Sequence, residues 1–267
     1  MILQDIINII ESVAPLSYQE SWDNSGLQVG DRNAEVHEAL LTVDVTESVV
    51  DEAISLGCDL IISHHPLLFR GLKHLTGATP QERCVEKAIR HNIAIYSAHT
   101  SMDSYLHGVS GQMAEKLGVH DYRVLCAANP ANEFGLGVIG ELAEAMDREA
   151  FVAHVASVFA SPQASLRWVE GASKTIRKVA LCGGAGAEFV EQAIEQGAVA
   201  YISADFKYHE LQAAYQRITV VDMDHWVSEH FTREIFQQLL SPYIRTRIAA
   251  TDKSPIIYHH QSLNTKH

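Results

Sequence analysis

Apolar positions along the chain follow two spacings, one typical of helices and one typical of buried strands. Residues 1–16 carry isoleucine, leucine and valine three or four positions apart, which predicts an amphipathic helix. Five elements then alternate, beginning with a strand: 39–45, 47–56, 59–63, 81–91 and 93–98. Because strands that alternate with helices form parallel sheets covered by helices, the pattern predicts an α/β fold.

The helix predicted at 47–56 carries signals at both ends. Thr46 or Asp44 precedes it and can accept hydrogen bonds from its first turn. Gly57 follows it and can take the left-handed conformation that ends many helices. The bounds of this helix are therefore predicted from local sequence alone.

The same order of strand, helix and strand returns in the second half of the chain. It is predicted at 179–182, 187–196 and 198–203. A shift of 140 positions superposes the two units at core residues: Leu41 on Leu181, Val50 on Val190, Ala53 on Ala193, Gly57 on Gly197 and Ser63 on Ser203. A shift of 126 then places 91–103 on 217–229. The pattern predicts an internal duplication.

The segment between the two units, 122–178, is expected to begin a second domain. It has glycines and a proline around short periodic stretches. Strands are predicted at 136–142 and 165–169, and a helix near 147–159.

Composition narrows the class of protein. Hydrophobic residues make up 47% of the chain and charged residues 20%, the balance of an ordinary globular protein. The formal net charge of -13, with 20 scattered lysines and arginines, makes DNA binding unlikely, because a grip on duplex DNA needs cations along the phosphates. No apolar stretch is long enough to span a bilayer, and the N-terminus lacks the pattern of a signal peptide. We expect a soluble protein in the cytoplasm, without membrane contact.

Cysteine and histidine usage point to different roles. The four cysteines lie far apart without a C-x-x-C pair, which predicts reduced and mostly buried thiols: Cys58, Cys84, Cys126 and Cys182. The fifteen histidines are the unusual feature of the composition, and several of them follow predicted strands.

His64 and His65 follow directly on the strand predicted at 59–63. Open parallel sheets place their sites at the carboxyl ends of strands, and a turn there can direct both imidazoles into one crevice. Taken alone, the pair is explained equally well as a polar exit from the strand.

Each repeat also ends a strand with a histidine that is followed four residues later by a carboxylate. His99 and Asp103 form this pair in the first copy, and His225 and Glu229 form it in the second. A helix beginning near Trp226 would put the second pair on one face. Either pair alone also occurs by chance on surface helices. Ligand-type residues at three strand ends together predict a metal site, and the duplication supports His99 as strongly as His225.

A two-metal site would explain this set chemically. Two divalent ions roughly 3.5–4 Å apart lower the pKa of a shared water and polarise the bond that the water attacks. Imidazole and carboxylate ligands suit Zn, Fe, Mn or Ni, so the identity of the metal stays open. We interpret His99 as the candidate catalytic residue, a proton shuttle, with a further ligand or an outer hydrogen-bond partner as alternatives.

Two loops have two interpretations each. Residues 22–30 predict either a loop that offers Asn24 or Gln28 to a ligand, or a plain turn with Trp22 anchored in the core. Residues 205–209 take the place of the His-His pair in the second copy and predict either a phosphate or proton-transfer site or a structural ion pair. The candidates there are Asp205, Lys207 and His209.

Two other groups of residues are interpreted as lying outside the chemistry. Gly183, Gly184 and Gly186 do not complete a nucleotide-binding motif, so they predict a tight turn between strand and helix. The tail histidines are not expected to be ligands: His259, His260 and His267.

Five motifs in this order resemble the NGG-interacting-factor-three-like family, also known as GTP cyclohydrolase I type 2 homologs. They are WDNSGLQVG (22–30), SHHPLLF (63–69), AHTSMD (98–103), DFKYHE (205–210) and HWVSE (225–229). The resemblance implies two divalent metal ions per subunit, held by His64, His65, Asp103, His225 and Glu229. Only the resemblance indicates that His225 is a ligand and that His99 is not.

The resemblance further implies two intertwined α/β domains and a ring-shaped homohexamer. We place the first domain at 1–125 plus 225–267 and the second at 126–224. Where the family shows Gly-Asp before Lys-Tyr-His, this chain has Ala204-Asp205-Phe206.

The expected function is that of a two-metal-dependent hydrolase-like protein. Its substrate would be a small nucleotide-like or phosphorylated molecule, and GTP cyclohydrolase-type ring opening is one form of the reaction. The alternative is a metal-binding regulatory or protein-interaction ring without turnover. An open coordination position beside a pocket would favour the enzyme, whereas a closed site would favour the alternative.

Overall fold

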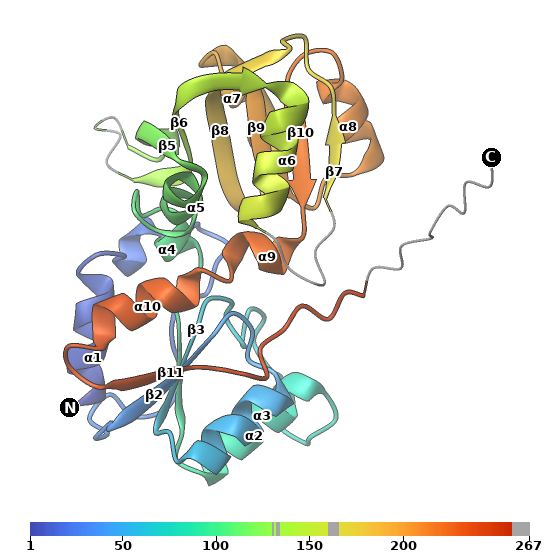
Figure 1. The fold of residues 1–267 in the computed structure, drawn as a ribbon. Coiled ribbons are helices and arrows are strands. Elements are labelled where there is room, and N and C mark those ends of the chain that lie inside the picture. Colours follow the sequence, from blue (N-terminus) through green and yellow to red (C-terminus); the bar gives the residue numbers. More distant parts are fainter. Residues whose placement is uncertain (130, 132–133, 160–165, 258–267) are drawn as a thin grey trace.

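The computed structural model describes residues 1–129, 131, 134–159 and 166–257. Within them the chain forms two lobes, each a sheet with helices on both faces (Figure 1). The predicted α/β fold with two sheets is confirmed.

The first lobe is built on a five-stranded sheet in the order β1-β4-β3-β2-β11. Neighbouring strands are parallel except for β1, which pairs antiparallel with β4. The strands are β1 (Gly26–Val29), β4 (Ala94–Ser97), β3 (Leu60–Ser63), β2 (Glu38–Thr42) and β11 (Arg245–Ile248).

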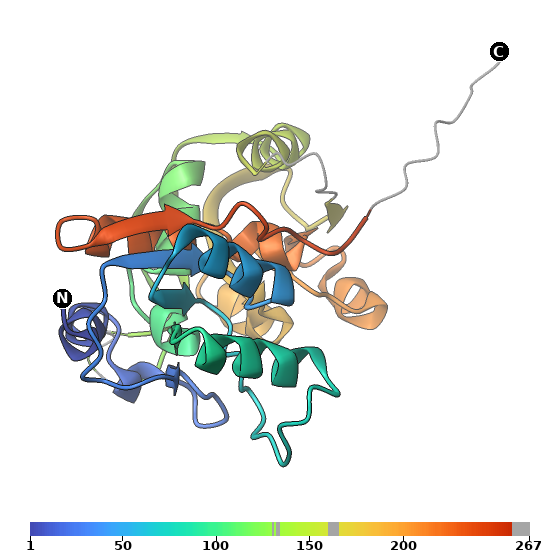
Figure 2. The same cartoon turned by 90° about the horizontal axis from the view of Figure 1, so that it is seen from below.

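Helices cover both faces of this sheet because its strands are apolar on both sides. Within β2, Ala39 and Leu41 pack into one core and Leu40 into the other, as the alternation of side chains along a strand requires. The helices are α1 (Leu3–Glu11) and α10 (Thr232–Leu240) on the first face, and α2 (Glu47–Leu56) and α3 (Pro80–Arg90) on the second. Figure 2 shows α2 and α3 side by side.

Local sequence signals set the ends of α2 as predicted. Thr46 accepts a hydrogen bond from the Val49 N–H at 3.3 Å, and Gly57 has the left-handed φ of 70° that closes the helix. Asp44, the alternative cap, has a different partner in the site described below.

The second lobe is built on a six-stranded sheet in the order β5-β6-β8-β9-β10-β7. Strands β8, β9 and β10 are parallel, and the remaining pairs are antiparallel. The strands are β5 (Val119–Ala127), β6 (Gly135–Asp147), β8 (Thr175–Ala185), β9 (Ala200–Ala204), β10 (Thr219–Met223) and β7 (Arg167–Val169).

Two cores lie against the faces of this sheet. The helices are α5 (Val109–Leu117) and α6 (Arg148–Val158) on one face, and α7 (Val190–Glu195) and α8 (Tyr208–Ala214) on the other. The helix predicted at 187–196 divides into a 3-10 turn at 187–189 and α7. Residue 165 of the strand predicted at 165–169 lies outside the described residues, as do the three tail histidines.

The chain passes between the lobes more than once, so the lobes are intertwined. Helices α4 (Thr100–Asp103) and α9 (His225–Glu229) lie at these passages, and α10 and β11 then complete the first lobe. The predicted domain boundary at 125 stays a prediction; the sheets themselves change at β5, which begins at Val119.

Two further predictions concern membrane-spanning helices and the state of the cysteines. Among the described residues no helix combines the length and apolarity that crossing a membrane requires. Cys58, Cys84 and Cys182 are buried, Cys126 is half-buried, and all four are free thiols, as predicted.

Asp252, beyond β11, ties the first sheet to the passage at α9. Its buried carboxylate accepts from the Val43 N–H at 2.8 Å and from Trp226 Nε1 at 3.1 Å. Arg233 Nη1 lies 3.2 Å from the same group. One carboxylate therefore joins the end of β2 to the start of α9.

Replacing Asp252 with Ala should lower the free energy of unfolding by about 3 kcal/mol, because Arg233 would remain buried without its partner. Urea denaturation checks this. The exposed pair of Asp51 and Lys87 provides the control, and Asp51→Ala should cost less than about 1 kcal/mol. Equal losses in the two variants would contradict the tethering role.

Candidate metal centre

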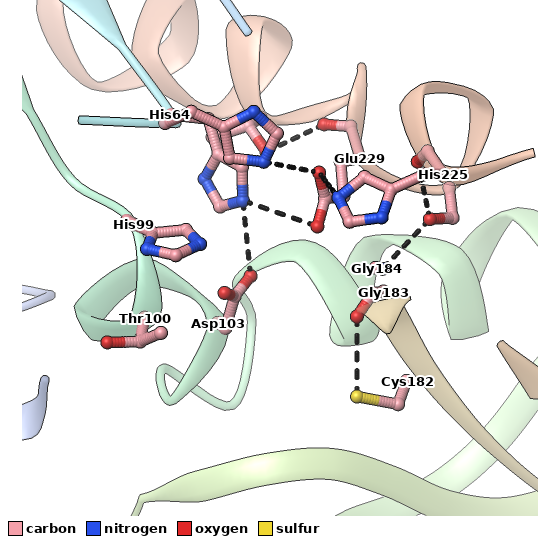
Figure 3. Close-up of polar contacts among 12 residues, drawn as sticks. His64, His99, Thr100, Asp103, Cys182, Gly183, Gly184, His225 and Glu229 are labelled. Atoms are coloured by element: carbon pink, nitrogen blue, oxygen red, sulfur yellow. Dashed lines mark hydrogen bonds and ion pairs between the residues drawn. The ribbon is translucent and has the colours of Figure 1, made fainter. Parts of the chain in front are cut away.

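The predicted site residues meet where the end of β3, α4 and α9 approach one another. Figure 3 labels four of the five predicted ligands: His64, Asp103, His225 and Glu229. His64 and His65 leave the end of β3, and Asp103 closes the short helix α4. His225 and Glu229 stand one turn apart on α9, which begins at His225. Asp224 precedes this helix and accepts a hydrogen bond from the Val227 N–H, so a local cap fixes where α9 starts.

Glu229 lies at the centre of the cluster and is 3% exposed. His65 Nε2 lies 2.9 Å from Glu229 Oε2, and His225 Nε2 lies 3.0 Å from the same oxygen. His64 Nε2 lies 3.7 Å from Glu229 Oε1 and 3.6 Å from Asp103 Oδ1. Imidazole nitrogens and carboxylate oxygens thus converge on one small volume.

Several of these converging atoms lack hydrogen bonds. His64 is fully buried; its Nδ1 lies 3.1 Å from the Ala98 carbonyl oxygen, but its Nε2 has no hydrogen-bond partner. Asp103 Oδ1 is likewise buried without a hydrogen bond, and Glu229 Oε2 has only the Nε2 atoms of His65 and His225 beside it. Buried polar atoms without hydrogen bonds are costly, and a bound cation would satisfy His64 Nε2 and Asp103 Oδ1 at once. The donor set therefore fits a metal.

The electrostatics of the cluster also favour a cation. Burial disfavours a charged His65, but hydrogen bonds with Asp44 and Glu229 outweigh burial and raise its pKa to about 11. For His225 burial is outweighed by Glu229 and then Asp205, which raise the pKa to about 9. The carboxylates draw protons onto the imidazoles, which is where a divalent ion would replace them.

Outer carboxylates orient two of these imidazoles. Asp44 Oδ1 lies 2.8 Å from His65 Nδ1, and Asp205 Oδ2 lies 2.6 Å from His225 Nδ1. Each bond leaves Nε2 turned toward Glu229, the arrangement typical of metal-binding histidines. Asp205 holds a left-handed φ of 60°, which aspartate tolerates better than most residues. Residues 205–209 were interpreted either as a phosphate or proton-transfer site or as a structural ion pair. The contact of Asp205 with His225 agrees with the ion pair.

Lys207 and His209 point elsewhere. Lys207 is exposed at the start of α8, and His209 Nδ1 lies 3.2 Å from Gln212 Oε1. Neither residue is near enough to line the cavity beside the cluster.

The loop at 22–30 supplies a residue that sequence reasoning missed. Asp23 Oδ1 lies 2.8 Å from His99 Nδ1, so Nε2 is the ring nitrogen of His99 left for the site. Asn24 and Gln28, the residues first considered, bond to the backbone of Leu68 instead.

Trp22 in the same loop is 57% exposed, so its predicted anchoring in the core is wrong. The hydrogen bonds of its neighbours, and not burial of the indole, hold this turn. No local signal in the sequence indicates this pairing, because Asp23 and His99 lie 76 positions apart.

Two overlapping groups of potential ligands have their atoms within 4.8 Å of one another. One is His64, His65 and His99, and the other is His65, His225 and Glu229. The first group supports His99 as a ligand, as the duplication does, whereas Asp103 belongs to neither group. The ligand set and the catalytic assignment of His99 therefore stay predictions.

A cavity of about 220 Å³ adjoins the cluster. Its lining includes Asp103, His225 and Glu229 from the cluster together with His99 and Trp22. The cluster is thus accessible through this cavity.

A model of the family described as Duf34/NIF3 (NGG1p interacting factor 3) matches residues 1–255. The chain belongs to the DUF34/NIF3 family. The resemblance drawn from the five motifs is confirmed.

Relatives and solved structures agree with this membership. The chain is 36% identical over 229 residues to the GTP cyclohydrolase 1 type 2 homolog of Clostridium acetobutylicum, covering 85% of each protein. It is 35% identical over 230 residues to that of Clostridium perfringens, covering 86% of this chain and 87% of the relative. A crystal structure of a Bacillus cereus protein related to NIF3 superposes with a TM-score of 0.87 at 25% identity, covering 97% and 99% of the two chains.

In this DUF34/NIF3 chain Gly184 passes against the central carboxylate. Its φ is +64°, and a Cβ on it would lie 2.1 Å from Glu229 Oε1. Its N–H donates to Ser228 Oγ at 2.8 Å, and its carbonyl accepts from Ser203 Oγ at 2.9 Å. The glycines predicted to form a turn after the strand lie differently: Gly183 and Gly184 belong to the end of β8, where the missing side chain of Gly184 lets the backbone approach Glu229 closely.

Gly184→Ala should displace Glu229 and lower bound metal, because the methyl group and the carboxylate would occupy the same space. Metal analysis of the dialysed protein measures this. Gly57→Ala is the matched control, since Gly57 has a φ of +70° but no atom within 4 Å of the added Cβ. It should lose stability by about 1 kcal/mol and keep its metal. Full metal content in Gly184→Ala would refute the argument.

The metal-free protein should become less stable as the pH rises from 6.5 to about 9. Protonated His225 stabilises the fold beside Glu229; this contribution is complete below the ordinary pKa of 6.5 and is lost through the folded value of about 9. Metal needs deprotonated imidazoles, so the stability that added Zn²⁺ confers should grow over the same interval.

Thermal unfolding midpoints at both pH values, with and without Zn²⁺, measure this pH dependence. Glu229→Gln removes the charge that raises the pKa of His225 and should flatten the metal-free profile. A flat wild-type profile would count against the electrostatic account.

Proposed function

We propose that this chain is a two-metal-dependent hydrolase whose substrate is a small nucleotide-like or phosphorylated molecule. The observation that carries the proposal is that the cluster around Glu229 opens onto a cavity. Structural metal sites are usually closed by protein ligands, whereas catalytic sites keep an open position for water or substrate.

Residues from both lobes would hold the ions: His64, His65, Asp103, His225 and Glu229. Two divalent ions held there, of Zn, Fe, Mn or Ni, would supply Lewis acidity and a water of lowered pKa. The outer carboxylates of Asp44 and Asp205 keep the Nε2 atoms of two imidazoles directed inward.

His99 is the residue that we assign to proton transfer. Burial of Asp23 is outweighed by hydrogen bonds from His99 and Thr100, which hold the pKa of Asp23 well below its usual range. The Asp23 carboxylate therefore stays ionised and fixes the imidazole through Nδ1. Nε2 of His99 is then free to accept or donate a proton in the cavity.

The names of the relatives favour one form of this reaction. They are called GTP cyclohydrolase 1 type 2 homologs, and in that chemistry water opens the imidazole ring of a purine and formate leaves. A nearby histidine that relays protons suits such a sequence of steps, which is the place we give to His99.

We also infer a homohexameric ring, as the family resemblance implies, and keep the cytoplasmic location as a prediction. The alternative function, a regulatory or protein-interaction ring without turnover, would use the metals only to join the lobes. The cavity beside the cluster favours catalysis over this alternative.

Two variants test the function. His99→Gln should keep the wild-type metal content and lower the turnover of GTP or a phosphate ester by about 100-fold, the scale of a lost general acid or base. Glu229→Ala should lose both metal and turnover. Metal analysis, product assay and sedimentation mass are measured on each.

The outcomes separate the roles. Loss of metal in His99→Gln would make His99 a ligand. If Glu229→Ala also abolishes the assembly of the 29.5 kDa chains, the metals have a structural role. Wild-type metal-loaded protein without turnover on either substrate class would overturn the hydrolase proposal.

A further inference from the structure

Two aromatic side chains stand exposed beside the candidate centre. Trp22 is 57% exposed and Phe69 45% exposed, and their ring centroids lie 6.0 Å apart. The His99 ring lies 6.0 Å from Trp22 and 6.4 Å from Phe69. Water therefore reaches apolar faces directly next to the imidazole assigned to proton transfer.

Hydrogen bonds fix the two loops that present these rings. Asp23, next to Trp22, is held by His99, by Ser25 Oγ at 2.8 Å and by Thr100 Oγ1 at 2.6 Å. Asn24 Nδ2 donates to the Leu68 carbonyl, next to Phe69, at 2.7 Å. The rings are thus placed by polar anchors and not by burial, so their faces remain free to stack against a planar ligand.

The adjoining cavity is small, and neither lysine nor arginine of the described residues lines it. Its volume of about 220 Å³ is below the roughly 300 Å³ at which pockets for drug-sized ligands begin, so one ring system fits better than a whole nucleotide. Recognition of a phosphate group inside this cavity would have to come from the metals or from the imidazoles of the lining.

Glu188 is the polar side chain of the lining that belongs to neither the cluster nor its hydrogen-bond partners. It is exposed and forms no hydrogen bond or ion pair with another described residue. An ionised carboxylate only accepts hydrogen bonds, and its two oxygens match two adjacent N–H donors. The cavity therefore offers a stacking surface at Trp22 and an acceptor pair at Glu188.

We propose that Trp22 and Glu188 recognise a planar heteroaromatic ring with adjacent N–H donors, which enters the cavity ring first. Trp22 stacks on the ring, with Phe69 beside it at the mouth, and Glu188 accepts from the donor edge. This assignment rests on the proposed function, because it names the part of the substrate that the site selects.

Binding of three probes to the Zn²⁺-loaded full-length chain tests the assignment by calorimetry. Guanosine has two adjacent N–H donor groups, inosine lacks one of them, and ribose 5-phosphate lacks the ring system. Guanosine should bind about tenfold more tightly than inosine. Trp22→Ala should weaken guanosine binding about tenfold or more, the scale of base stacking on an aromatic side chain, and Trp22→Phe should restore most of it.

Glu188→Gln should bring the affinity for guanosine close to that for inosine. Two matched controls should leave guanosine binding unchanged. Tyr243→Ala removes an aromatic ring that is also 57% exposed but lies outside the cavity. Glu195→Gln neutralises an exposed carboxylate at the end of α7, likewise outside the cavity.

The result that would overturn the assignment is guanosine binding that is absent or insensitive to both Trp22→Ala and Glu188→Gln. A change of sedimentation mass in Trp22→Ala with unchanged guanosine affinity would also overturn it, and would make the aromatic pair an interface between chains. Guanosine binding that depends on Trp22 in a protein without turnover would support the recognition site while the hydrolase proposal fails. If Trp22→Ala does not change the turnover of GTP, the hydrolase proposal stands and the recognition role of Trp22 is refuted.

Discussion

The buried carboxylate of Glu229, faced by three imidazoles, is the interaction on which the arrangement of the lobes depends. His64 and His65 come from the first sheet, whereas His225 and Glu229 follow the second. A carboxylate and imidazoles this close in a dry volume need positive charge between them, as protons or as metal. Neighbouring residues keep this arrangement in place. Gly184 leaves room for the Glu229 carboxylate, and the carboxylates of Asp44 and Asp205 orient the imidazoles of His65 and His225.

The elements that local sequence determines were predictable, and the contacts that cross the fold were not. Both ends of α2 follow from Thr46 and Gly57, which act within one turn of the helix. The ligand-type residues were found because parallel strands bring their carboxyl ends together, so position along the chain was enough. The partners of the imidazoles lie far away: Asp23 is 76 positions from His99, and Asp205 is 20 positions from His225. Asp44 was considered only as a cap, because nothing local indicates which side chain a loop carboxylate will meet.

His99 and His225 correspond in the predicted duplication, but they have different surroundings in the fold. His225 lies 3.0 Å from Glu229 on its own helix. His99 lies beside Trp22 and Phe69, with its outer partner in the N-terminal loop. Equivalent backbone positions therefore carry unequal chemistry. Sequence symmetry could not distinguish them, since the difference comes from Asp23, which lies 76 positions away from His99 in the N-terminal loop.

The link made by Asp252 has a consequence for how the centre assembles. Val43 precedes Asp44, which orients His65, and Trp226 follows His225. One carboxylate therefore joins the backbone on one side of the cluster to an indole on the other side. The ligands that follow the first sheet and the ligands on α9 are thereby held at a high effective concentration relative to one another. The entropy of bringing them together is lost when the chain folds, and not when a cation binds. A proteolytic cut between β11 and Asp252 would thus lower metal affinity without removing a single ligand.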